Sequence, residues 1–267
     1  MKNDIIGRKQ EIEILNEKYT SRKSEFVALY GRRRVGKTYL VRNLFEDKFT
    51  FRLTGLGQAD LKLQLANFYD ALAEQYPKVK LKEADNWMEA FRQLRNIIEK
   101  SKQKRKILFI DELPWFDTPH SGFIPALEHF WNSWASARKD ILLIVCGSAA
   151  SWMISKLINN KGGLHNRVTQ KLRLEPFTLK ECEALLRKRN NHLDHSSLFN
   201  CIWYWAVIRF TGMPSKKDKV PHRTLISYVL ITTVYYQESL IIYLNHYSLK
   251  PNVTKPLLLL LQKKIRV

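Results

Sequence analysis

Gly31-Arg32-Arg33-Arg34-Val35-Gly36-Lys37-Thr38 is the stretch of sequence that decides the fold. It fits the pattern G-x-x-x-x-G-K-[ST], in which the glycines let the backbone turn so that N–H groups point at phosphate oxygens. Lys37 can reach the β- and γ-phosphates of a nucleoside triphosphate, and the Thr38 hydroxyl can bind Mg²⁺. The pattern predicts a phosphate-binding loop to which all eight residues contribute; the alternative is a basic surface turn.

The residues on either side of this loop supply the context that the pattern requires. Glu25–Tyr30 is a short apolar run rich in strand formers, and Tyr39–Phe45 has the periodicity of an amphipathic helix. A helix that begins at the loop presents its positive N-terminal end to a bound anion. The order of strand, loop and helix therefore supports the phosphate-loop interpretation.

A second candidate site follows the apolar run Ile107–Ile110, which ends in Asp111 and Glu112. Asp111 is expected at the carboxyl end of a strand, where α/β sheets bind ligands. Its carboxylate suits Mg²⁺, which prefers oxygen ligands and keeps part of its hydration. We predict that Thr38 and Asp111 hold the metal and that Glu112 is the catalytic base, which polarises the attacking water. The alternative is that the acidic pair begins a surface turn.

Predicted strands alternate with predicted helices along the first 194 residues. Each strand is a nearly continuous apolar run, which is typical of a parallel sheet covered on both faces. The fold class is therefore α/β, and we predict a three-layer sandwich of the P-loop NTPase type. The strands after the first are expected at Phe49–Thr54, Ile107–Ile110, Ile141–Cys146 and Lys171–Leu174.

The composition indicates an ordinary globular protein with a strongly basic surface. The 267 residues include 45 Lys and Arg against 25 Asp and Glu, which gives a net charge of +20. This length allows about one or two domains. A basic surface suits nucleic acid, because neutralisation of phosphates dominates non-specific binding. The alternative is a solvated basic surface without a partner.

The spacing of the cysteines and the hydropathy of the chain indicate the cellular compartment in which the protein is expected. The three cysteines have neither metal-ligand nor disulfide spacing, which agrees with a reducing cytosol. The polar first residues do not form a secretory signal. Ser227–Leu244 is fairly apolar, but Gln237 and Glu238 within it argue against a membrane span. We therefore expect a cytoplasmic protein that does not contact a membrane.

The order of the motifs resembles that of the prokaryotic archaeal-type ATPases of the AAA+/STAND group. The resemblance covers residues 3–194, and the extra predicted strand at residues 49–54 is similar to that of the additional-strand ATPases. The matching segments are Ile6-Gly7-Arg8 with Glu11, Gly31–Thr38, Ile110–Trp115, Cys146–Met153, Gly162–Arg167 and Leu174–Phe177.

The resemblance implies roles for residues outside the two motifs. Gly7 and Arg8 would lie near the adenine of ATP. Ser148 resembles the sensor residue that orients the attacking water, although a turn serine is the alternative. Arg167 matches the position of an arginine finger, which usually acts from a neighbouring subunit and so implies a homo-oligomer; the alternative is a surface arginine. His165 is expected to be structural rather than catalytic.

The segment 195–267 departs from the family pattern, which continues with Tyr-Met-x-x-Gly-Gly-x-Pro and a helical lid. Codons shifted by one frame around Phe199–Ala206 permit Gln-Leu-Tyr-Met-Val-Leu-Gly-Gly-x-Pro. We therefore expect an ATPase domain at 1–194 and, at 195–267, a frameshifted, poorly ordered, non-native tail that replaces the lid and downstream domains. The alternative is a divergent second domain.

The sequence thus predicts ATP binding, with Mg²⁺-dependent hydrolysis coupled to a conformational change and impaired by loss of the lid. The alternative is a nucleotide-gated module that binds DNA or protein without significant turnover. A small-molecule kinase would need an acceptor pocket and a lid, to which no sequence feature points. A decayed, non-functional gene product is the third alternative.

Overall fold

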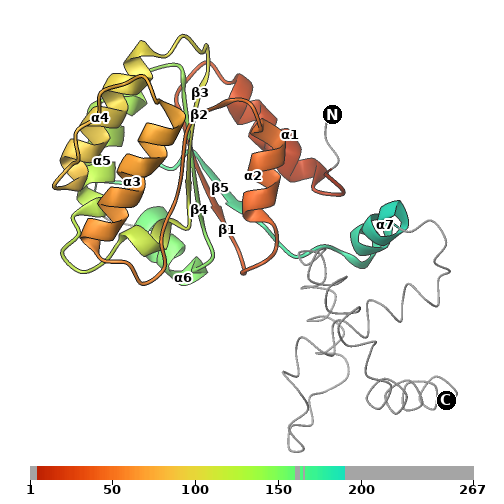
Figure 1. The fold of residues 1–267 in the computed structure, drawn as a ribbon. Helices are drawn as coiled ribbons and strands as arrows, with labels where there is room; N and C mark the ends of the chain where they lie inside the picture. Colours follow the sequence, from red (N-terminus) through yellow and green to blue (C-terminus); the bar gives the residue numbers. More distant parts are fainter. Residues whose placement is uncertain (1–4, 160–162, 165, 190–267) are drawn as a thin grey trace, which may run out of the picture. The chain divides into compact units, whose positions relative to one another are not determined.

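The computed structural model describes residues 5–159, 163–164 and 166–189. Up to Glu175, the described residues form five parallel strands in the order β2-β3-β4-β1-β5 (Figure 1). The part of the chain from Pro176 onward is a separate unit, in which helix α7 (Leu179–Arg189) is described. The strands are β1 (Glu25–Tyr30), β2 (Phe49–Thr54), β3 (Lys106–Asp111), β4 (Ile141–Gly147) and β5 (Gln170–Arg173).

Helices cover both faces of the sheet, which confirms the predicted three-layer α/β fold. One face carries α1 (Lys9–Thr20) and α2 (Lys37–Phe45) (Figure 1). The other carries α3 (Leu61–Gln75), α4 (Trp87–Lys100) and α5 (Phe123–Ser133). The short helix α6 (Ala150–Trp152) and a π-helical turn (Met153–Ile158) follow β4. Among the described helices, none combines the length and the apolar character that crossing a bilayer requires.

The central strands form because their side chains are buried on both faces of the sheet. Every residue of β3 and β4 is buried. In β3, Leu108 and Ile110 join the core under α3, α4 and α5, whereas Ile107 and Phe109 join the core under α1 and α2. This two-sided burial explains why these strands are continuous apolar runs instead of alternating patterns.

The register of the sheet places the ends of three strands at one edge. Tyr30 at the end of β1 pairs with Gly147 at the end of β4, and Ile110 of β3 pairs with Val145 of β4. The segments that leave β1, β3 and β4 therefore emerge side by side. This carboxyl edge is where ligands bind in open α/β sheets.

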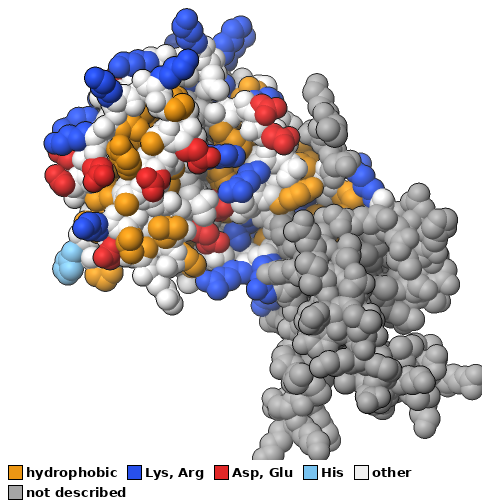
Figure 2. Space-filling view, in the orientation of Figure 1, with side chains coloured by type: hydrophobic (Ala, Val, Ile, Leu, Met, Phe, Trp, Pro, Cys, Tyr) orange, Lys and Arg blue, Asp and Glu red, His pale blue; other side chains and the backbone are white. Residues whose placement is uncertain are grey.

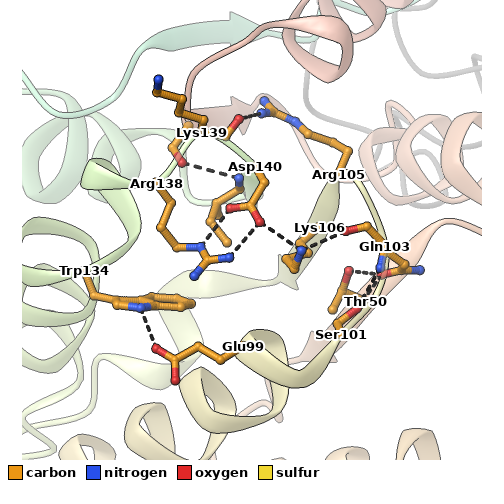
Figure 3. Close-up of polar contacts among 12 residues, drawn as sticks. Thr50, Glu99, Ser101, Gln103, Arg105, Lys106, Trp134, Arg138, Lys139 and Asp140 are labelled. Carbon is orange, nitrogen blue, oxygen red and sulfur yellow. Dashed lines mark hydrogen bonds and ion pairs between the residues drawn. The ribbon is translucent and has the colours of Figure 1, made fainter.

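The opposite edge, where the strands begin, is basic. Figure 2 shows Lys and Arg side chains gathered along the upper border of the molecule, above the sheet as it is drawn in Figure 1. One acidic side chain at this edge, Asp140, accepts two hydrogen bonds from Arg138, at 2.8 and 2.7 Å, and one from Lys106 at 2.8 Å (Figure 3).

This ion-pair network makes Asp140 a stabilising carboxylate. Burial alone would raise the pKa of Asp140, but the bonds from Arg138 and Lys106 outweigh it and lower the pKa from 3.8 to about 2. Because the folded-state pKa is lowered, the stabilisation is complete above the unfolded value near 3.8 and is lost as the pH falls through 2. The network therefore holds the starts of β3 and β4 together at neutral pH.

Candidate nucleotide-binding site

The predicted phosphate loop, Gly31–Thr38, leaves β1 at the carboxyl edge of the sheet and leads directly into α2. Gly31 has φ +150°, and a Cβ there would lie 2.4 Å from the carbonyl oxygen of Leu174, so a side chain is excluded. Gly36 has φ 96° and precedes the first residue of α2. The glycines of the motif therefore stand where close approach and a left-handed backbone require them.

The side chain of Lys37 is folded onto the phosphate loop itself. Only 5% of the residue is exposed, and its Nζ donates to the carbonyl oxygens of Gly31, at 3.1 Å, and Arg32, at 2.7 Å. Burial lowers the pKa of Lys37, while the nearby acidic groups of Asp111 and Glu112 oppose this shift. A buried ammonium group with these two hydrogen bonds can replace the carbonyl oxygens by phosphate oxygens as its acceptors.

The phosphate loop and the Asp-Glu pair, far apart in sequence, are joined by a hydrogen bond. Thr38 Oγ1 donates to Asp111 Oδ2 at 2.7 Å, and Asp111 is 3% exposed. The other carboxylate oxygen of Asp111 accepts from the backbone N–H of Glu112 at 2.9 Å. The two oxygen-bearing groups predicted to hold Mg²⁺ are thus direct neighbours.

Glu112 has an unusual backbone and a fixed side chain. Its φ of 49° and ψ of 45° are left-handed, which costs a non-glycine residue on the order of 1 kcal/mol. Its Oε2 accepts a hydrogen bond from Ser148 Oγ at 3.0 Å. Ser148 therefore contacts the predicted base directly, as its place after β4 at the carboxyl edge allows.

The N-terminal segment also reaches the phosphate loop. Arg8 is 6% exposed, and its Nη2 donates to the carbonyl oxygen of Val35 at 3.1 Å. Its Nη1 donates to Glu11 Oε1 at 3.2 Å. Gly7 precedes it with φ 67°. Arg8, which precedes the first residue of α1, thus supports the loop through a contact that the sequence did not specify.

Arg167 is the one predicted site residue that lies apart from this group. It is exposed in the turn before β5, and the next residues pair with the start of β1, where Thr169 N–H donates to Phe26 O at 2.9 Å. Arg167 therefore belongs to the edge of the sheet where strands begin. The length of β1, roughly 20 Å at about 3.3 Å per residue, separates it from the phosphate loop of its own chain. His165 lies outside the described residues.

Two side chains of α5 hold the turn that leads to Arg167. Glu128 Oε1 accepts from Leu164 N–H at 2.8 Å, and Asn132 Nδ2 donates to Gly163 O at 2.7 Å. Leu164 is fully buried. Neither contact can be predicted from the sequence, because spacing within α5 does not indicate which turn the helix supports.

Cys146 is another neighbour of the site that sequence reasoning missed. It lies one residue before the end of β4, is fully buried and is close enough to Asp111 to feel its charge. Burial, helped by the charge of Asp111, raises the pKa of the Cys146 thiol well above its usual value. The thiol therefore stays protonated. The position of Cys146 at the end of a predicted strand was the sequence signal that could have placed it near the site.

Gln64 joins the loop after β2 to the segment that follows Glu112. It is fully buried, and its Nε2 donates to Leu56 O at 2.6 Å and Trp115 O at 3.1 Å, while its Oε1 accepts from Leu56 N–H at 3.2 Å. A glutamine next to Leu65 in the apolar stripe of α3 was the sequence signal for this role.

Sequence comparisons with known proteins find an ATPase-domain family and archaeal relatives. A family model described as an ATPase domain predominantly from Archaea matches residues 5–207. The chain is 27% identical over 184 residues to the uncharacterized protein MJECL04 of Methanocaldococcus jannaschii. The aligned segment covers 69% of this chain and 38% of that relative. The chain is 46% identical over 44 residues to the uncharacterized ATP-binding protein MJ0423 of the same organism, covering 16% of this chain and 75% of the relative. The chain thus spans well under half the length of the first relative.

Solved structures share the fold. The Walker-type ATPase PABY2304 of Pyrococcus abyssi aligns with a TM-score of 0.53 at 20% identity, over 72% of this chain and 60% of that one. Cdc6p of Pyrobaculum aerophilum aligns with a TM-score of 0.50 at 17% identity, over 76% of this chain and 55% of that one. The motif order, the parallel sheet and the family match agree, and the chain belongs to the family of ATPase domains found predominantly in Archaea.

Proposed function

We propose that the chain binds ATP with Mg²⁺ between the phosphate loop and the pair Asp111-Glu112, and hydrolyses it to drive a conformational change. The observation that carries this proposal is the 2.7 Å hydrogen bond between Thr38 and Asp111, beside the buried Lys37. It unites two motifs separated by 73 residues at the carboxyl edge of a parallel sheet. Membership in an ATPase-domain family supports nucleotide binding by the same chain.

The residues present suit a triphosphate and a magnesium ion. Lys37 and the N-terminal end of α2 offer positive charge to the phosphates. The Thr38 hydroxyl and the Asp111 carboxylate are oxygen donors of the kind that Mg²⁺ binds directly or through water. A bound Mg²⁺ would neutralise charge on the phosphate oxygens.

Hydrolysis would use Glu112 as the general base. Glu112 takes a proton from water while the water oxygen forms a bond to the γ-phosphorus and the bond to the bridging oxygen breaks, which yields ADP and inorganic phosphate. A positioned base contributes about 10²–10⁴ in rate. Ser148 orients Glu112 through the 3.0 Å hydrogen bond to its carboxylate.

Arg167 would complete the site of a neighbouring subunit. Its side chain is exposed at the edge opposite its own phosphate loop, which suits contact with another copy. An arginine finger supplied in this way contributes about 10³–10⁵ in rate. The proposed ATPase is therefore a homo-oligomer in which each site receives Arg167 from its neighbour.

Mixing two inactive variants tests this arrangement. Lys37→Ala and Arg167→Ala should each hydrolyse ATP very slowly in a phosphate-release assay. An equal mixture should recover turnover, up to about a quarter of the unaltered rate if the subunits mix at random. Full activity of Arg167→Ala alone, or a mixture as slow as its components, would exclude action of Arg167 across subunits.

The second candidate function is a nucleotide-gated module that grips DNA or protein without significant turnover. The net charge of +20 favours this candidate, because a basic surface attracts polyanions. Phosphate release, measured beside a salt-dependent DNA titration, separates the two functions. ATP binding without release of phosphate favours the gated module.

We further propose that residues 195–267 are translated from a shifted frame, so that the lid and the modules beyond it are replaced. This segment lies outside the described residues, and the family match ends within it, at residue 207. The reconstructed reading Tyr-Met-Val-Leu-Gly-Gly supports the proposal. Sequencing of the coding DNA decides it, since codons that cannot encode this run in the other frame contradict a frameshift.

A further inference from the structure

The loops that lead into three adjacent strands carry exposed basic side chains. We call these five residues the amino-edge surface: Arg22 and Lys23 before β1, Lys102 and Lys104 before β3, and Lys139 before β4. The register brings the loops together, because Glu25 of β1 pairs with Leu142 and Lys106 of β3 pairs with Ile141.

Arg105 ties these loops to one another. Its Nη1 donates to the carbonyl oxygens of Lys23, at 2.8 Å, and Lys139, at 3.1 Å (Figure 3 shows the contact with Lys139). Its Nη2 donates to Lys18 O at 2.6 Å. One guanidinium group therefore fixes the backbones of basic loops beside each other, although the exposed charges on them repel.

Little acidic charge remains to neutralise this surface. Asp140 is engaged by Arg138 and Lys106, as described above. Glu25 is 1% exposed and accepts a hydrogen bond from Ser21, with the ammonium groups of Lys18 and Lys23 each 3.9 Å away. Within the described ranges, no ion-pair partner is found for Arg22, Lys102, Lys104 and Lys139.

Three further groups of acidic side chains lie near this edge. Glu17 near the end of α1 pairs with Lys18, and Glu99 near the end of α4 is bound by Arg95 and Trp134. The third group is in the turn before β2. This turn carries the exposed residues Glu46 and Asp47 beside Lys48. Because β2 is the outer strand of the sheet, this turn flanks the surface instead of crossing it. The positive charge is thus concentrated over β3, β4 and β1.

We propose that the amino-edge surface binds the sugar–phosphate backbone of duplex nucleic acid, independently of base sequence. A membrane-binding surface would add apolar side chains that enter the lipid, and a single-strand binder would add aromatic side chains that stack on bases. None of the large exposed apolar residues of the described part of the chain belongs to the loops of this surface; they are Tyr39, Leu56, Leu63, Val79, Met88, Trp115 and Ile154. Because this surface lies at the edge opposite the phosphate loop of the same chain, nucleic acid and ATP would bind at separate places on each subunit.

A charge-matched pair of variants of the full chain tests the proposal. The first, Lys102→Gln/Lys104→Gln/Lys139→Gln, removes three charges from the amino-edge surface. The second, Lys9→Gln/Arg42→Gln/Lys62→Gln, removes three exposed charges from helices α1, α2 and α3. Anisotropy of a fluorescein-labelled DNA duplex of about three helical turns, measured between about 50 and 200 mM salt, gives the affinity and its salt dependence.

The first variant should bind about tenfold more weakly, and its salt slope should fall by about two to three, since each lost phosphate contact lowers the slope by about one. The second variant should bind as the unaltered chain does. Equal losses in both triple variants, no loss in the first, or the absence of duplex binding would overturn the proposal. So would binding to phosphatidylserine vesicles in place of the duplex.

Discussion

The Lys37→Ala variant is expected to lose ATP binding almost completely. The ammonium group that now bonds to the carbonyls of Gly31 and Arg32 would instead form charge-assisted hydrogen bonds to the phosphates. Such bonds are each worth about 1.5–3 kcal/mol, so two of them correspond to at least a hundredfold loss of affinity, at about 1.4 kcal/mol per factor of ten. Titration with a fluorescent ATP analogue measures the change.

Two controls make the Lys37 result specific. Lys62→Ala removes an exposed lysine from the first turn of α3 and should leave ATP affinity unchanged. A thermal melt of Lys37→Ala checks that the fold survives the loss of the two carbonyl contacts. Unchanged ATP affinity in a folded Lys37→Ala protein would refute the assignment of the phosphate loop.

Replacing Glu112 by glutamine should keep ATP binding and remove turnover. The amide has nearly the shape of the carboxylate but cannot take a proton from water, so phosphate release should fall by about 10²–10⁴. Affinity should hold, because the metal-binding oxygens are expected on Thr38 and Asp111. Single-turnover phosphate release beside the ATP titration measures both quantities on one preparation.

The Ser148→Ala variant tests how much the hydrogen bond to Glu112 contributes to turnover. It removes the hydroxyl that donates to Glu112 Oε2, so it should slow turnover less than Glu112→Gln and leave ATP affinity unchanged. In a double variant, Ser148→Ala should add little to the loss caused by Glu112→Gln, because the two residues act through one contact. Undiminished hydrolysis by Glu112→Gln would exclude Glu112 as the base.

The sequence predicts that the Gly31–Thr38 loop and Asp111 come together, because their positions follow from local spacing and from strand order. The eight residues of the phosphate loop have fixed spacing, and their glycines mark the left-handed turn. Asp111 ends a predicted parallel strand, so its arrival beside Thr38 follows from the shared carboxyl edge. The predicted strand Phe49–Thr54 matches β2 residue for residue, and that prediction is confirmed.

The supporting contacts could not be predicted, because they depend on how distant elements pack. Nothing in the spacing of Arg8 indicates that its guanidinium donates to Val35, and nothing in α5 indicates that Glu128 accepts from Leu164. The position of Arg167 is different. Arg167 precedes a strand that runs parallel to β1. Sequence order alone therefore places it at the edge where the strands begin, away from the phosphate loop. The resemblance to the ATPase family does not by itself indicate this position.

A titration of the unaltered chain with ATP, in the presence of Mg²⁺ and again with excess EDTA, tests the central claim most directly. The site formed by Lys37, Thr38 and Asp111 predicts saturable binding in the micromolar range with Mg²⁺, and weaker binding once the metal is removed. An isotherm that shows no saturable binding of ATP, with or without Mg²⁺, would contradict it.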